Sequence, residues 1–163
     1  MERPIHRYRR FKDWDYSRGA SFFITLSLDE RKPLFGQVHD GIVCLSELGR
    51  EVLASLERIP VLEPAITLYG HVVMPDHVHF ILEQPVCQAG DHIGAPLREI
   101  VSWFKTMTTN DYIRHVKRGE YAPFEGRLWQ RNYYEHVIRN EEDYLQTAAY
   151  IEGNPTRWSE KYE

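Results

Sequence analysis

The segment that most constrains the fold is PAITLYGHVVMPDHVHFILEQ, residues 64–84. Aromatic and β-branched residues on either side of Met74-Pro75-Asp76 are typical of strands, and proline followed by aspartate favours a turn. The segment therefore predicts an antiparallel hairpin whose two strands form part of the central sheet.

The remaining pattern predicts strands at 21–28 and 133–139 and helices at 45–59 and 98–116. Pro60 is expected to stop the first helix. Asn140 offers an N-cap for a last helix, and Gly153 and Pro155 are expected to end it. The order is strand, helix, strand, strand, helix, strand, helix. This order predicts an α+β fold, a ferredoxin-like βαββαβ sandwich with an antiparallel sheet and an additional C-terminal helix.

The length of 163 residues suits one domain, and we expect a basic N-terminal arm over 1–19 and the ferredoxin-like core over 20–155. No apolar run approaches the length of a membrane span, and the N-terminus lacks the apolar core of a secretory signal, so we expect a cytoplasmic protein. Cys44 and Cys87 have no metal-site spacing and are expected to be reduced thiols.

The formal net charge of -4 argues against a nucleic-acid binder, but the basic residues are unevenly distributed. Five lysines and arginines fall within residues 1–12, and five more within 95–118. For either segment alone, a solvated face is the commoner interpretation.

Two histidines stand out in the second strand of the hairpin. His77 and His79 alternate with Val78, so their side chains share one face of the strand and can bind one metal ion. By pattern alone, the commoner alternative is a pair of half-exposed strand histidines without a ligand.

The last helix carries a second candidate group. At 100° per residue, Tyr144, Ala148 and Ile151 form the buried stripe, whereas Tyr150 and Asn154 are i, i+4 neighbours on a polar face. A phenol beside a metal-bound phosphate can act as a nucleophile. The alternative is an amphipathic tyrosine at a helix edge, with Asn154 ending the helix.

Five ordered stretches resemble a known family. They are WDYSRGASFFITLSLDERKPLFG (14–36), HVVMPDHVHFILE (71–83), LREIVSWFKTMTTNDYI (97–113), LWQRNYYEHVIRNEEDY (128–144) and YIEGNP (150–155). Together they are similar to the HUH-type single-tyrosine transposases, and most similar to the REP-associated tyrosine transposases.

The resemblance implies that His77 and His79 bind a divalent metal, Mg²⁺ or Mn²⁺, and that Tyr150 attacks DNA to leave a 5′-phosphotyrosine and a free 3′-hydroxyl. The resemblance also places Asn154 where related insertion-sequence transposases carry a metal-site glutamine, and its shorter side chain would reach the metal directly or through a water molecule.

The expected partner is single-stranded or hairpin DNA. The candidate DNA contacts are Arg7, Arg9, Arg10, Lys105 and Arg131. Two alternatives remain: a domesticated hairpin-binding protein that no longer transposes, and a metalloprotein that acts on a small molecule. The chain acts either as a monomer or as a homodimer.

Overall fold

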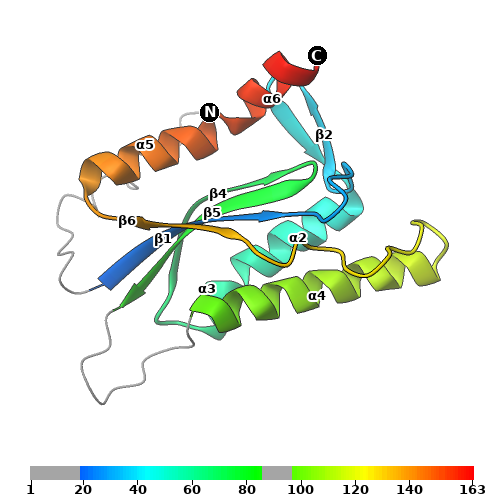
Figure 1. Cartoon of the computed structure of the whole chain (residues 1–163), viewed down its shortest axis with the longest axis horizontal. Helices are drawn as coiled ribbons and strands as arrows, with labels where there is room; N and C mark the ends of the chain where they lie inside the picture. Colours follow the sequence, from blue (N-terminus) through cyan, green and yellow to red (C-terminus); the bar gives the residue numbers. More distant parts are fainter. Residues whose placement is uncertain (1–18, 86–96) are drawn as a thin grey trace.

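The computed structural model describes residues 19–85 and 97–163 (Figure 1). The strands are β1 (Gly19–Ser27), β2 (Gly36–His39), β3 (Ile42–Leu45), β4 (Thr67–Met74), β5 (His77–Pro85) and β6 (Tyr134–Ile138). The helices are α2 (Glu47–Glu57), α3 (Ile59–Leu62), α4 (Leu97–Lys117), α5 (Glu141–Glu152) and α6 (Asn154–Tyr162). None of these described helices is both long enough and apolar enough to span a membrane.

The central sheet has four strands in the order β4-β5-β1-β6, and each neighbouring pair is antiparallel. The predicted hairpin is confirmed, because β4 and β5 pair from Met74 opposite His77 onward. The α+β class with an antiparallel four-stranded sheet is likewise confirmed.

Side-chain alternation along the strands builds a hydrophobic core on each face of the sheet. Val78, Phe80 and Leu82 join the larger core, to which α2 and α4 contribute. Ile81 and Phe23 belong to the smaller core beneath α5. Figure 1 shows α2 and α4 on one side of the sheet and α5 on the other. His77 and His79 therefore face α5.

The first predicted helix differs from the structure at its C-terminal end. Ser46 caps α2 by accepting a hydrogen bond from the Gly49 amide at 3.0 Å, and Leu48 and Val52 are buried as predicted. Pro60 does not end helical structure. It lies in the first turn of α3, where the missing N–H of proline removes no intrahelical hydrogen bond.

The last predicted helix begins as expected and continues differently. Asn140 caps α5, and Tyr144, Ala148 and Ile151 are buried. The predicted end of this helix at Gly153 is confirmed, because α5 stops at Glu152 with Gly153 as its C-cap, but Pro155 does not stop helical structure. Gly153 keeps a right-handed backbone, and Pro155 sits in the first turn of α6, which follows at once.

The hairpin of β2 and β3 was not predicted from the sequence. Its two-residue turn is Asp40-Gly41, both with positive φ, which is a favoured hairpin sequence. Figure 1 shows this hairpin beside α6 at one end of the sheet. Cys44 in β3 is an exposed free thiol, whereas Cys87 lies outside the described residues.

Gly49→Ala is expected to lower the free energy of unfolding by about 1 to 3 kcal/mol, because α2 approaches the preceding loop too closely for a side chain. A Cβ at this position would lie 2.0 Å from the Phe35 carbonyl oxygen. Denaturant unfolding followed by circular dichroism measures the change. Gly70→Ala is the control, since its Cβ would make an ordinary contact at 3.8 Å. Equal stability of the two variants would contradict the close approach.

Candidate functional site

His77 and His79 lie side by side at the start of β5, with ring centroids 4.6 Å apart. The strand alternation that predicted a shared face is confirmed. They are not half exposed, as the alternative without a ligand supposed: His77 is 7% exposed and His79 is 4% exposed. The neighbours explain this burial, because Phe23 stacks on His79 and Trp158 of α6 packs against His77.

A buried carboxylate fixes the orientation of His77. Nδ1 of His77 lies 2.6 Å from Oδ1 of Asp76, and Oδ2 of Asp76 lies 2.9 Å from Nε of Arg31. With Nδ1–H donating to the carboxylate, Nε2 keeps its lone pair. A carboxylate behind an imidazole is a common second partner for a metal-binding histidine.

His79 is held in a similar way by a hydroxyl group. Thr25 lies directly opposite His79 in the pairing of β1 and β5, and its Oγ1 is 2.7 Å from Nδ1 of His79. Burial, followed by the nearby His77, Arg157 and Arg31, lowers the pKa of His79 to about 3. His79 is therefore neutral at physiological pH, which is the form of imidazole that binds metals.

The second nitrogen of each ring remains available. Within the part of the chain that the structure describes, neither Nε2 of His77 nor Nε2 of His79 has a hydrogen-bond partner. Two neighbouring imidazole nitrogens fit a divalent metal.

Tyr150 lies against this pair. Its ring centroid is 5.4 Å from that of His79 and 6.0 Å from that of Phe23, and the residue is 45% exposed. Its predicted position off the buried stripe of α5 is confirmed. Arg157 of α6 places its guanidinium 4.4 Å from the ring centroid and donates a hydrogen bond to the Tyr150 carbonyl oxygen. The phenol is therefore positioned by both helices.

Asn154 departs from its predicted position. It is the first residue of α6 and is 7% exposed, so it does not share the exposed face of Tyr150. The helical count from Tyr144 fails because α5 ends before this residue. Trp158, one turn further along α6, lies 6.0 Å from His77 between ring centroids. Asn154 is on this same face of α6.

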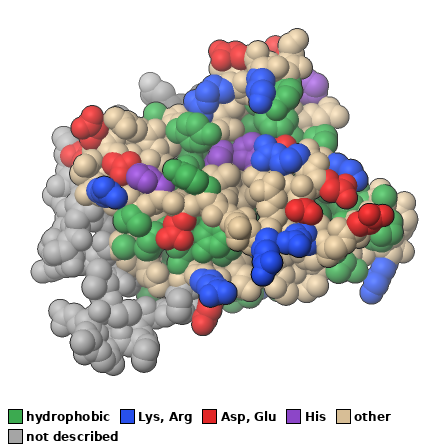
Figure 2. Space-filling view, in the orientation of Figure 1, with side chains coloured by type: hydrophobic (Ala, Val, Ile, Leu, Met, Phe, Trp, Pro, Cys, Tyr) green, Lys and Arg blue, Asp and Glu red, His purple; other side chains and the backbone are tan. Residues whose placement is uncertain are grey.

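Two predicted DNA contacts lie close together elsewhere. The Lys105 ammonium donates to the carbonyl oxygen of Gln130 at 2.8 Å and lies 3.5 Å from that of Arg131. Arg7, Arg9 and Arg10 lie outside the described residues. Figure 2 shows histidine side chains at the middle of one face, with lysine and arginine side chains beside and below them.

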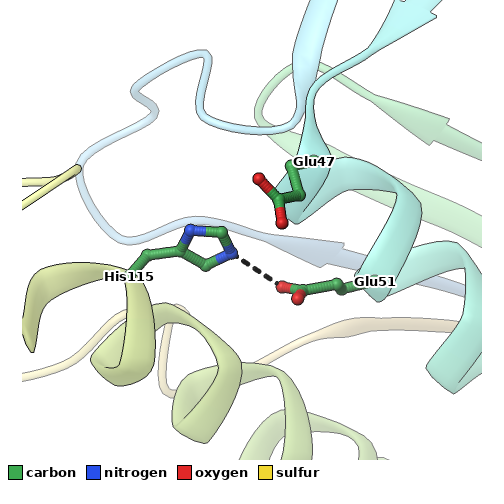
Figure 3. Close-up of side chains that lie close together, drawn as sticks. All are labelled: Glu47, Glu51 and His115. Carbon is green, nitrogen blue, oxygen red and sulfur yellow. Dashed lines mark hydrogen bonds and ion pairs between the residues drawn. The ribbon is translucent and has the colours of Figure 1, made fainter. Parts of the chain in front are cut away.

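A second cluster that could hold a metal ion lies between α2 and α4 (Figure 3). Ligand atoms of Glu47, Glu51 and His115 lie within 4.8 Å of one another. Nε2 of His115 is 2.9 Å from Glu51, and Nδ1 bonds to Glu120. Burial lowers the pKa of His115, but the hydrogen bonds to Glu120 and Glu51 outweigh it and raise the pKa overall. An ion here would have to displace a proton.

The sequence did not single out this cluster. Glu47 and Glu51 are i, i+4 neighbours, which was a readable signal, but His115 joins them only through the packing of α2 on α4. Arg31, Thr25 and Arg157 were also missed, because their roles depend on strand pairing and helix packing.

Comparison with known proteins gives the family. The model of the family described as "Transposase IS200 like" matches residues 50–154. An uncharacterised protein of Haemophilus influenzae is 32% identical, over 96% of this chain and 92% of that protein. The REP-associated tyrosine transposase of Escherichia coli is 25% identical, over 94% of this chain and 74% of that protein.

A solved structure is also similar in fold. A REP-associated tyrosine transposase bound to a REP hairpin aligns with a TM-score of 0.62 and 22% identity, over 88% of this chain and 71% of that chain. The family match covers more than half of the chain and includes His77, His79 and Tyr150. The chain belongs to the IS200-like transposase family.

Proposed function

We propose that the protein cuts and rejoins single-stranded DNA at hairpin-forming sequences, through a covalent 5′-phosphotyrosine on Tyr150. The observation that carries this proposal is the contact between Tyr150 and His79, 5.4 Å between ring centroids, beside a second histidine with a free nitrogen. A potential nucleophile and a potential metal site thus adjoin one another. The family supplies the reaction class, transposition of DNA.

His77 and His79 would bind Mg²⁺ or Mn²⁺ through Nε2, because Asp76 and Thr25 occupy the two Nδ1 atoms. Asn154 is the candidate third ligand. It is buried at the start of α6, one turn before Trp158, which packs against His77. The bound ion would polarise the scissile phosphate and stabilise the charge that develops on it.

Tyr150 would carry the covalent step. Its phenol oxygen attacks the phosphorus, the phenol proton passes to solvent, and the bond from phosphorus to the 3′ oxygen breaks. The departing oxygen takes up a proton and becomes a free 3′-hydroxyl. Attack by a second 3′-hydroxyl reverses the step without an external energy source. Arg157 holds the ring and backbone of Tyr150 in place for this attack.

The fold and the oligomeric state are interpreted in agreement with this proposed function. We interpret the sheet order β4-β5-β1-β6, with α2 and α4 as its crossing helices, as ferredoxin-like and as the core of one domain. The contact between Tyr150 and His79 within one chain supports a monomer that acts in cis. A homodimer that exchanges α5 is the alternative.

Hairpin DNA is the proposed substrate, because the structural relative described above was solved with a REP hairpin. Lys105 and Arg131, together with Arg7, Arg9 and Arg10 of the N-terminal arm, remain the proposed contacts to DNA. A domesticated protein that binds the hairpin without cutting it is the second candidate.

Incubation with a labelled single-stranded hairpin and Mn²⁺ is expected to give a protein–DNA band that survives a denaturing gel. Tyr150→Phe is expected to abolish this band, because it removes the attacking oxygen. Tyr134→Phe is the matched control, since Tyr134 is also exposed and its ring lies 6.0 Å from Phe23. A band that persists in Tyr150→Phe would overturn the assignment. Hairpin binding without any covalent band would support the domesticated alternative.

Stability of the metal-free protein is expected to fall as the pH drops from about 6.5 to about 3. In this window the unfolded chain protonates His79 while the folded chain does not, because burial lowers its pKa to about 3. His79 therefore does not reduce the free energy of unfolding above pH 6.5, but it lowers that free energy by a few kcal/mol by pH 3. Urea unfolding in EDTA should give a flatter pH profile for His79→Gln than for the exposed-residue control His39→Gln. Identical profiles would refute the predicted shift.

A further inference from the structure

A groove of about 510 Å³ runs between α4 and the segment that leads to β6. Three cations line it, Lys105, Arg127 and Arg131. Thr106, Thr109 and Asn110 of α4 add hydroxyl and amide groups, and none of the described lining residues is acidic. Such cations and neutral donors are the groups that contact phosphate oxygens in protein–DNA complexes. We call this hollow the basic groove.

The positive charge of the basic groove is not neutralised by the protein. No ion pair joins Lys105, Arg127 or Arg131 to a carboxylate in the described part of the chain. Burial, and then the nearby charge of Arg127, lower the pKa of Lys105. In a chain of formal charge -4, unpaired cations that repel one another favour a bound anion. Figure 2 shows lysine and arginine side chains below the histidines on the same face of the molecule.

The basic groove is connected to the site of His77 through the end of β1. The Gln130 amide of the groove donates to the Ser27 carbonyl oxygen at 2.9 Å, and Ser27 lies opposite His77 in the sheet. Arg31, which holds Asp76, also donates to Oγ of Ser27 at 2.8 Å. A single DNA strand that passes from the histidine site over Ser27 would therefore enter the basic groove.

We propose that the basic groove binds the phosphates of the single DNA strand that flanks the cleavage site, through Arg127 and Arg131. This proposal rests on the proposed function. A single strand is favoured over the hairpin stem because the groove adjoins the site where one strand is cut, and positively charged grooves commonly track a single-stranded backbone. Lys105 adds positive charge to the groove and also ties α4 to the backbone of the groove wall.

The test compares DNA binding by charge-matched variants. Arg127→Gln/Arg131→Gln removes two groove cations. Arg50→Gln/Arg58→Gln, the α2 variant, removes two exposed cations, Arg50 of α2 and Arg58 at its C-cap, neither of which lines the groove. Every protein also carries Tyr150→Phe, so that the DNA stays intact. Fluorescence anisotropy measures affinity over a series of salt concentrations, for a hairpin with a flank of about ten nucleotides and for the same hairpin without it.

The groove variant is expected to lower the salt slope of log K by about 1.4, since each single-strand phosphate contact contributes about 0.7. This slope corresponds to roughly 25-fold weaker binding near 0.1 M salt if the affinities converge near 1 M. The α2 variant should bind as the parent does, and the loss should disappear on the hairpin without a flank. A loss that persists on the flankless hairpin would overturn the single-strand assignment.

The remaining outcomes separate the two proposals. If the parent binds DNA and the groove variant binds equally well, the groove assignment fails and the proposed function stands. If the parent binds neither DNA at low salt with Mg²⁺, both fail. Arg127→Lys/Arg131→Lys keeps the charge and is expected to retain the salt slope. Thermal melts identify any variant that fails to fold. If the glutamine variant fails to fold, the Arg127→Lys/Arg131→Lys variant provides the test, because a lowered salt slope in that variant contradicts a charge role.

Discussion

The pairing of β1 with β5 is the constraint on which the candidate site depends. It places Thr25 opposite His79 and Ser27 opposite His77, so one strand supplies the hydroxyl that orients a ring and the other supplies both rings. A slip of one residue would turn the histidines into the core that α2 and α4 cover. The tight turn at Pro75-Asp76 limits such a slip, and it also delivers the carboxylate that orients His77.

Packing of α5 on the opposite face of the sheet completes the arrangement. Tyr144, Ala148 and Ile151 anchor the helix in the smaller core, and this leaves Tyr150 half exposed against His79. The resulting site combines a buried neutral imidazole with an accessible phenol. Burial disfavours the protonated form of His79, and the exposure of Tyr150 leaves its phenol accessible to a polymer. The basic groove lies beside α4 and is joined to the strand of the histidines by the Gln130–Ser27 backbone hydrogen bond.

Local periodicity predicted the hairpin, the shared face of His77 and His79, and the position of Tyr150 off the buried stripe. It could not predict Thr25 or Arg31, because their contacts depend on strand register and loop conformation. Asn154 was misplaced because a straight helix was extended across Gly153. The Asp40-Gly41 turn was a readable hairpin signal, but short strands give little periodicity.

Pulsed electron paramagnetic resonance of bound Mn²⁺ tests most directly the proposal that His77 and His79 bind the ion. Couplings to two histidine nitrogens are expected. They should vanish in His77→Gln/His79→Gln and persist in His115→Gln. The opposite result would contradict the account: coupling to one nitrogen that survives the first substitution and disappears in the second would place the ion at Glu47, Glu51 and His115 instead.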